Sequence, residues 1–209
     1  NLDKKAVKGC ILNSRILWFF SSAYLCLKDP ALLDNAEHAY RFMLDHCVDG
    51  DMGGVYWSVN FDGSVCDDTK HTYNQAFAIY ALAAYARATG KQEPIDLAWK
   101  IYEIIESKCR DKDGYLEAFT RDFKPASNEK LSENGVMATR TMNTLLHVFE
   151  GYSGLYQATK DERLAARIRE MMDIFVEKIY NTELRRQEVF FDADYHTLID
   201  LHSYGHDIE

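Results

Sequence analysis

An almost wholly apolar run lies near the middle of the chain and reads Ala76-Phe77-Ala78-Ile79-Tyr80-Ala81-Leu82-Ala83-Ala84-Tyr85-Ala86. A helix formed by these residues would have hardly any polar face. Such a helix is stable only when other elements bury most of its sides. The run therefore predicts a central helix that other helices surround.

The same pattern occurs three times along the chain. Asn13, Asn74 and Asn143 each open an apolar helical stretch, and they are 61 and 69 residues apart. A short polar link follows each stretch, and after it comes a second helix with apolar residues at helical spacing. The second helix at residues 161–178 is amphipathic, which is typical of an outer position. Each repeat is thus predicted to be a hairpin of one inner and one outer helix.

Strand-like pieces separate the hairpins, and Asp62-Gly63 in the first of them is a typical hairpin turn. An open solenoid would accommodate such repeats, but inner helices that are apolar on most sides favour a closed ring. The predicted elements are inner helices at about 11–26, 69–89, 136–158 and from 198, and strand pairs near 54–65, 114–123 and 188–196. These elements make about three and a half hairpins.

Inner helices of a ring point their N-terminal ends at a central cavity. Polar residues near those ends are therefore candidates for a functional site. Besides the residues discussed below, these candidates are Asn13, Lys70, Asn74, Gln75 and Arg140.

The composition is that of a globular protein, with 209 residues, 47% of them hydrophobic, and a net charge of −9. No basic run occurs, which argues against a nucleic-acid or anionic-membrane surface. The apolar stretch at residues 16–27 is too short to span a bilayer. The five cysteines are scattered and include no Cys-x-x-Cys pair, so they indicate neither a zinc site nor a disulfide framework. We therefore expect a cytoplasmic protein.

The run from His196 to Glu209 concentrates three histidines and three carboxylates in fourteen residues. We expect a helix to begin at Leu198. In that helix, His202, His206 and Glu209 would lie at i, i+4 and i+7 on one face. Imidazoles aligned with a carboxylate suit proton transfer at carbon. The alternatives are histidines that merely cap or pair, and a metal site, since two histidines one turn apart have ligand-like spacing.

Five motifs follow one another along the chain. They are Arg15-Ile16-Leu17-Trp18-Phe19-Phe20-Ser21, Gly53-Gly54-Val55-Tyr56-Trp57, Lys70-His71-Thr72-Tyr73-Asn74-Gln75-Ala76-Phe77, Met142-Asn143-Thr144-Leu145-Leu146-His147-Val148-Phe149-Glu150 and Ser203-Tyr204-Gly205-His206-Asp207-Ile208-Glu209. Each motif alone is moderately specific. As a series through the whole chain, they resemble the N-acylglucosamine 2-epimerase family, and in particular its cellobiose 2-epimerase branch.

The resemblance implies an all-α fold, an (α/α)6 barrel with a sugar site in its mouth. Residues 1–209 would then be an incomplete single catalytic domain, and the C-terminal part of the barrel would lie outside this chain. The family's second catalytic histidine and the tryptophans that stack on the sugar belong to that part. We therefore expect the 209-residue chain alone to be inactive.

The resemblance also implies an isomerase that interconverts the glucose and mannose configurations at C2 of a reducing-end sugar without a cofactor. In the cellobiose branch, cellobiose is converted to 4-O-β-glucosyl-mannose. The family's catalytic arginine falls on Arg15, one catalytic histidine on His206, and its supporting glutamate on Glu209. Two sugar-contacting residues fall on Asn143 and His147.

These side chains suit the implied chemistry. A base must remove the C2 hydrogen of the ring-opened sugar, and histidine is an effective base near neutral pH. Glu209 could hold the tautomer of His206, and Arg15 could stabilise the enediolate oxygen. Tyr73 and Trp57 are further candidates for sugar contacts, although an aromatic residue in a β insert more often serves packing.

Several alternatives are open from the sequence alone. Within the family, N-acylglucosamine 2-epimerase and mannose isomerase activities compete with cellobiose epimerisation. A glycoside hydrolase or lyase on the same barrel would need a pair of carboxylates. The candidates for that pair are Asp192, Asp194, Asp200 and Asp207. A non-enzymatic helical scaffold would instead expose a concave surface.

The expected partners follow from the same observations. We expect a monosaccharide or oligosaccharide substrate, and no metal, cofactor, nucleic acid or membrane. At full length, we expect a monomer or a weak homodimer.

Overall fold

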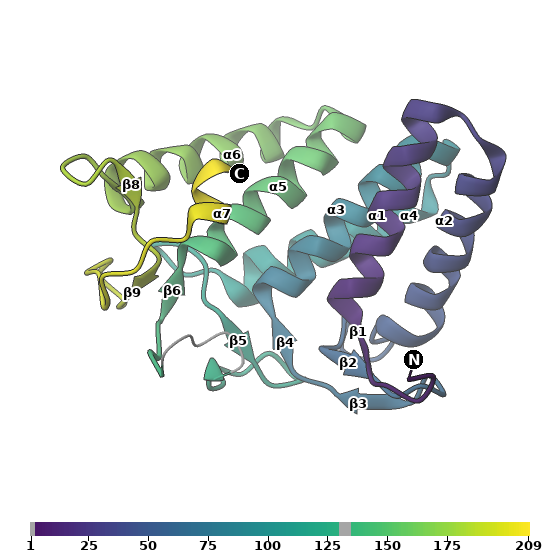
Figure 1. The fold of residues 1–209 in the computed structure, drawn as a ribbon, viewed down its shortest axis with the longest axis horizontal. Helices are drawn as coiled ribbons and strands as arrows, with labels where there is room; N and C mark the ends of the chain where they lie inside the picture. Colours follow the sequence, from purple (N-terminus) through teal and green to yellow (C-terminus); the bar gives the residue numbers. More distant parts are fainter. Residues whose placement is uncertain (1–2, 130–134) are drawn as a thin grey trace.

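The computed structural model describes residues 3–129 and 135–209, which form a curved row of helical hairpins (Figure 1). The inner helices are α1 (Cys10–Leu27), α3 (Thr72–Thr89) and α5 (Met142–Thr159), and the outer helices are α2 (Pro30–Phe42), α4 (Glu93–Ile104) and α6 (Glu162–Ile174). A short helix, α7 (Tyr204–Ile208), lies near the end of the chain. The first three predicted inner helices are confirmed, although the third begins later than expected because a strand precedes it.

Local sequence signals set the ends of these helices. Each inner helix ends at a residue in the left-handed conformation, with φ of 58° at Lys28, 73° at Gly90 and 58° at Lys160. Helices α2 and α6 begin after Asp29 and Asp161, whose side chains accept a hydrogen bond from the backbone N–H two residues on. The links between the helices are therefore tight, which makes the two helices of a hairpin antiparallel neighbours.

Each outer helix ends in a five-residue π turn, at Met43–Cys47, Ile105–Cys109 and Phe175–Ile179. A β excursion follows each of these turns. The strands are β1 (Lys8–Gly9), β2 (Ser58–Val59), β3 (Val65–Asp67), β4 (Lys70–His71), β5 (Ala118–Phe119), β6 (Arg140–Thr141), β7 (Tyr180–Asn181), β8 (Arg186–Gln187) and β9 (Phe190–Phe191).

The strand before each inner helix pairs with a strand that follows the outer helix of the same repeat. β1 pairs with β2, β4 with β5, and β6 with β9, all antiparallel. Each repeat is thus closed at the end where its inner helix begins, along the lower edge of Figure 1. The first predicted strand pair is confirmed by β2 and β3, at residues 58–67. In the other two, the chain turns back on β5 and β9 through the isolated bridges Phe119–Pro125 and Phe191–Thr197, and the returning residues are not assigned as strands among the described residues.

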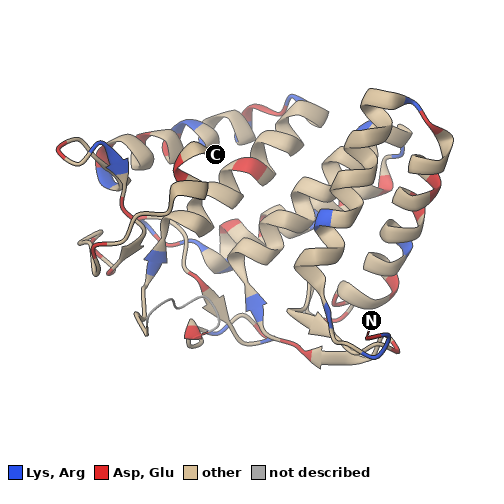
Figure 2. Cartoon of the chain, viewed as in Figure 1, with Lys and Arg blue, Asp and Glu red and all other residues tan. Residues whose placement is uncertain are grey.

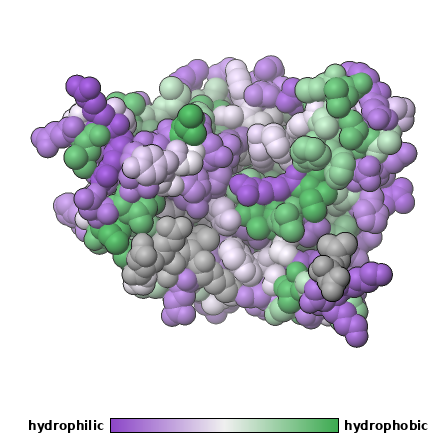
Figure 3. Space-filling view, viewed as in Figure 1, coloured by the Kyte–Doolittle hydropathy of each residue, from purple (hydrophilic) through white to green (hydrophobic). Residues whose placement is uncertain are grey.

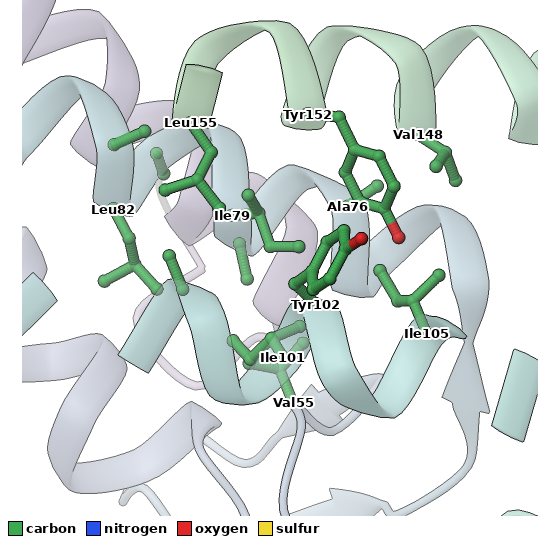
Figure 4. Packing of buried hydrophobic residues seen from close by; sticks show 14 of the residues in the cluster. Val55, Ala76, Ile79, Leu82, Ile101, Tyr102, Ile105, Val148, Tyr152 and Leu155 are labelled. Atoms are coloured by element: carbon green, nitrogen blue, oxygen red, sulfur yellow. The ribbon is translucent and has the colours of Figure 1, made fainter. Parts of the chain in front are cut away.

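Helix α3 is the central helix, as its apolar sequence predicts. Most of its residues are buried, and it packs between α1 and α5. Figure 4 shows Ile79 and Leu82 of α3 beside Leu155 of α5, with Ile101 of α4 on the other side. Burial of apolar surface stabilises the fold by about 25 cal/mol per Å², so this contact region forms the core of the chain.

Helix α1 is apolar but largely exposed. Leu12, Ile16 and Phe19 are 57%, 36% and 57% exposed, and Figure 3 shows apolar side chains gathered over this helix. Among the described residues, α1 is the one helix that is long and apolar enough to cross a membrane by length and composition, with a mean hydropathy of 1.3 and 22% of its residues buried. Core helices meet the same criteria. In a closed ring of hairpins, a further inner helix would cover this face of α1.

The fourth inner helix begins later than predicted. Residues 198–203 are not helical, and α7 spans only Tyr204–Ile208. Leu198 donates its backbone N–H to the carbonyl of Phe190, so it extends the hairpin that contains β9. The expected helical face of His202, His206 and Glu209 is therefore wrong, because His202 precedes the helix.

The three asparagines of the repeat do not hold the same position in their helices, because their spacings are one residue shorter than the spacings of the helix starts. Helices α1, α3 and α5 begin 62 and 70 residues apart, so the three asparagines hold the fourth, third and second helical positions. Their partners differ accordingly. Asn13 donates to the carbonyl of Gly9 within its own helix, whereas Asn74 donates to the carbonyl of Tyr56 in a β excursion. The repeat is real, but its asparagines are not equivalent.

Helices α3 and α5 approach closely at Gly151, where an added Cβ would lie 2.7 Å from the backbone oxygen of Ala76. We expect Gly151→Ala to lower the free energy of unfolding by about 1–3 kcal/mol, because a backbone atom cannot yield as a flexible side chain can. Gly50→Ala is the control, because a Cβ there meets nothing within 4 Å. Urea unfolding of the full-length variants would measure the effect, and equal stability of the two would contradict the packing argument.

Candidate active site

The sixth residues of the inner helices meet at one cavity. Arg15, Phe77 and His147 hold this position in α1, α3 and α5. Glu209 holds the corresponding position when counted from the start of α7 at Tyr204. All four line a cavity of about 340 Å³. They converge because every repeat begins its inner helix at the same closed end.

The ninth residues of the inner helices form a second layer, and they are Trp18, Tyr80 and Glu150. The rings of Trp18 and Tyr80 stack with centroids 5.2 Å apart and planes inclined by 20°. The same three side chains also border a neighbouring cavity of about 300 Å³, so this layer lies between the two cavities.

Opposite charges flank the first cavity. Arg15 on α1 is held over the ring of Phe77, with Cζ 4.6 Å from the ring centroid. Glu150 on α5 and Glu209 supply carboxylates to the same cavity. In Figure 2, the ribbon of α1 carries a basic segment and the ribbon of α5 an acidic one. The cavity can therefore offer charged hydrogen-bonding groups to a polar ligand.

His147 is held firmly on the wall of the cavity. Its side chain is only 3% exposed, and Nδ1 lies 2.6 Å from Oε2 of Glu150. The imidazole packs against Phe77 and Tyr73, with ring centroids 4.4 Å and 5.5 Å away. Since Nδ1 is engaged, Nε2 is the ring nitrogen left for a ligand.

His206 reaches the same place from α7. Its ring centroid lies 6.0 Å from that of His147, with the rings nearly perpendicular. Nδ1 of His206 lies 2.7 Å from the hydroxyl of Ser203, the residue before the helix. The structure thus brings together Arg15, His147, His206 and Glu209, which are far apart in the sequence.

Two further predicted residues adjoin the site without lining the cavity. Asn143 is half-buried one turn before His147, and its Oδ1 has no hydrogen-bond partner among the described residues. Tyr73 is half-buried, and burial raises the pKa of its phenol although Arg15 opposes the shift. Tyr73 is therefore a neutral donor, and Asn143 offers an acceptor.

Trp57 and His202 lie elsewhere. Trp57 packs against His71, with ring centroids 4.4 Å apart, and is not among the residues that line the cavity. Nε2 of His202 lies 2.8 Å from Oδ2 of Asp207, so this histidine is engaged in a local pair. Their assignment to the site finds no support in the geometry.

Other polar residues near the helix starts serve the scaffold rather than the cavity. Lys70 is fully buried and forms an ion pair of 3.0 Å with Asp49. Arg140 forms one of 2.7 Å with Asp111. Gln75 exchanges two hydrogen bonds with the backbone of Val55. The expectation that these side chains face the cavity is wrong, because buried polar groups on a closed edge require partners of their own.

Glu150, Trp18, Phe77 and Tyr80 line the cavity but were not among the predicted site residues. A sequence signal for Glu150 exists, since it follows His147 by three residues on one helix and so shares a face with it. The aromatic residues carry no such signal, because each also fits an ordinary core helix.

His147, His206 and Glu209 could together approach a metal ion. Each offers one ligand atom, and these atoms lie within 4.8 Å of one another. Zinc ligands bind at about 2.0–2.2 Å, so the side chains would have to close in around an ion. The set predicted as a metal alternative contained His202, which is not a member of this group.

Glu117 joins the starts of α3 and α5. Its carboxylate accepts hydrogen bonds from the backbone N–H of Thr141 at 2.7 Å and from the hydroxyl of Thr144 at 2.6 Å. Its backbone carbonyl accepts from the N–H of Thr72. Burial raises the pKa of Glu117 to about 7, although these hydrogen bonds favour the ionised form.

This shift predicts an unusual dependence of stability on pH. Because the folded-state pKa of Glu117 lies above its ordinary value of 4.5, the folded protein favours the protonated form. The contribution of Glu117 to the free energy of unfolding should therefore fall by about 3 kcal/mol as pH rises from about 4.5 to about 7. Glu117→Gln should remove this fall, whereas the exposed Glu183→Gln should not. Denaturant unfolding of the full-length variants across this range would test it, and parallel curves for wild type and Glu117→Gln would contradict it.

Helical hairpins whose inner helices place their sixth and ninth residues around one cavity with acidic and basic side chains are typical of α/α-barrel proteins. Comparison with known families completes the assignment: the chain belongs to the N-acylglucosamine 2-epimerase family, whose model matches residues 1–209.

Individual relatives agree with this assignment. The chain is 55% identical to a cellobiose 2-epimerase of Eubacterium cellulosolvens and 49% identical to one of Ruminococcus albus, with all of this chain covered and 56% and 54% of the relatives. The solved structure of a sugar epimerase from a ruminal bacterium matches with a TM-score of 0.97 at 48% identity, over all of this chain and 54% of that one. The chain thus has the (α/α)6-barrel fold in part and spans about half the length of its relatives.

Proposed function

We propose that the full-length protein is a carbohydrate 2-epimerase that converts cellobiose to 4-O-β-glucosyl-mannose at its reducing end. The observation that carries this proposal is that Arg15, His147 and Glu209 line one cavity, and that a ring nitrogen of His206 lies within 4.8 Å of the potential ligand atoms of His147 and Glu209. The relatives named cellobiose 2-epimerase support the choice of substrate. The proposal is for a cytoplasmic, cofactor-independent enzyme that is a monomer or a weak homodimer.

The reaction begins with the ring-opened sugar, whose C1 carbonyl makes the C2 hydrogen acidic. A base removes that hydrogen as a proton, the C2–H electrons form a C1=C2 double bond, and the carbonyl oxygen becomes an enediolate oxygen. Return of a proton to the other face of C2 gives the mannose configuration. No net oxidation occurs, so general acids and bases are sufficient.

His206 is assigned as one base, since its Nδ1 is engaged by Ser203 and its other nitrogen is left for substrate. Glu209 lies three residues after His206, immediately after the end of α7. Its carboxylate is assigned to stabilise the imidazolium that forms on His206. Arg15 supplies a permanent cation for the developing charge on the enediolate oxygen. Asn143, His147 and Tyr73 are assigned to the sugar hydroxyl groups.

Three of the four aspartates that were candidates for a glycoside hydrolase are paired with other side chains. Asp192 lies 2.9 Å from Nδ1 of His196, Asp200 pairs with Arg186, and Asp207 pairs with His202. None of these aspartates lines the first cavity. Hydrolysis by a pair of these aspartates is therefore the weaker candidate.

The test is to incubate the full-length protein with cellobiose, glucose, mannose and N-acetylglucosamine and to identify the products. Conversion of cellobiose to its mannose epimer is expected, with deuterium entering C2 when the reaction is run in D₂O. Activity on N-acetylglucosamine alone, isomerisation of mannose, or release of glucose from cellobiose would each point to one of the alternatives. Loss of activity on chelation with EDTA would contradict the cofactor-independent mechanism.

A further inference from the structure

Glu150 is the one charged side chain in the layer that it shares with the aromatic rings of Trp18 and Tyr80. Those two positions hold stacked aromatic rings, whereas α5 places a carboxylate there. The side chain of Glu150 is 29% exposed and borders both cavities. A carboxylate among aromatic rings is costly unless a hydrogen-bond donor satisfies it.

The donor is His147. Oε2 of Glu150 lies 2.6 Å from Nδ1 of that imidazole, and the two residues are one turn apart on the same helix. A carboxylate only accepts hydrogen bonds, so the proton of a neutral His147 must reside on Nδ1. Nε2 then carries a lone pair.

The imidazole of His147 cannot easily turn away from this arrangement. It is 3% exposed, and the rings of Phe77 and Tyr73 pack against it. Its potential ligand atom lies within 4.8 Å of those of His206 and Glu209. The orientation and the tautomer of His147 are thus set by packing and by Glu150 together.

We propose that Glu150 is a positioning residue, which holds the proton of His147 on Nδ1 so that Nε2 accepts a hydrogen bond from a sugar hydroxyl next to the reacting carbon. The inference rests on the proposed function for its sugar ligand. The tautomer itself is a property of the protein and can be measured without substrate.

The experiment compares the full-length wild type with Glu150→Ala, Glu150→Gln and, as a matched control on the outer helix α6, Glu162→Gln. His147→Ala and the double variant His147→Ala/Glu150→Ala serve for assignment and for the coupling test. Nitrogen-15 NMR of the histidine rings reports the tautomer of His147, assigned by comparison with His147→Ala. The wild type should carry the proton on Nδ1, and Glu150→Ala should shift it partly or wholly to Nε2. Glu150→Gln should be intermediate, because its amide oxygen can still accept from Nδ1.

The second measurement is the kinetics of cellobiose epimerisation. Glu150→Ala should lower kcat/KM for cellobiose by about 10–100-fold, the loss typical of removing the carboxylate partner of a metal-binding histidine. Glu162→Gln should be unchanged. In a His147→Ala background, Glu150→Ala should cause no further loss, since it acts through that histidine. If the unfolding midpoint of Glu150→Ala equals that of the wild type, its lower kcat/KM comes from the lost positioning of His147 and not from a loss of folded protein.

Two results would overturn the inference. One is an Nδ1-protonated His147 in Glu150→Ala, and the other is a full additional loss in the His147→Ala background. If the wild type were inactive on every sugar, the proposed function would be wrong. The role of Glu150 in holding the tautomer would still stand if the proton of His147 moved from Nδ1 in the wild type to Nε2 in Glu150→Ala.

Discussion

Replacing His206 by alanine in the full-length protein is expected to lower kcat for epimerisation by about 10²–10⁴-fold, the usual contribution of a positioned acid–base group. The folded state should change little, because α7 is short and has no buried residue. The rate of product formation and the rate of exchange at C2 in D₂O should fall together, since both need the same proton transfer.

His196→Ala is the matched control for this prediction. His196 lies in the same segment and also pairs with a neighbour, Asp192, but its side chain is 77% exposed. Its replacement should leave kcat within about threefold of wild type, as an exposed pair contributes little. Full activity of His206→Ala, or an equal loss in both variants, would remove His206 from the mechanism.

Replacing Arg15 by alanine should lower kcat by about 10²–10³-fold, as is typical when one group that stabilises an oxyanion is removed. The effect should fall mainly on kcat rather than on KM, because the enediolate charge exists only after proton removal. Arg15→Lys keeps the positive charge but loses the forked donor, so an intermediate rate is expected.

Arg169→Ala on the outer helix α6 is the control for Arg15. Arg169 is exposed and lies on an outer helix, away from the cavity. Its replacement should have no measurable effect on kcat. If Arg15→Ala raised KM and left kcat unchanged, then Arg15 would bind the sugar without stabilising the transition state.

The sequence alone was enough to predict the layout of the helices. The run at residues 76–86 is apolar on all sides, and only a central helix can bury it. The hairpin turn at Asp62-Gly63 and the N-cap at Asp161 also lie where local signals put them. The motifs around Arg15 and His147 identified two residues that the fold places in one cavity.

The tertiary structure decided which polar side chains face the cavity. Lys70 resembles a site residue in sequence, but its partner Asp49 lies 21 residues away from it. The same carboxylate also binds Arg121, which lies 72 residues from Asp49. Residues 198–203 fit a helix by pattern, yet pairing with β9 makes Leu198 part of a hairpin. Helical periodicity and capping are local and can be read along the chain. The partner of a buried polar group is set by packing between distant segments, so only the folded structure separates Lys70 from Arg15.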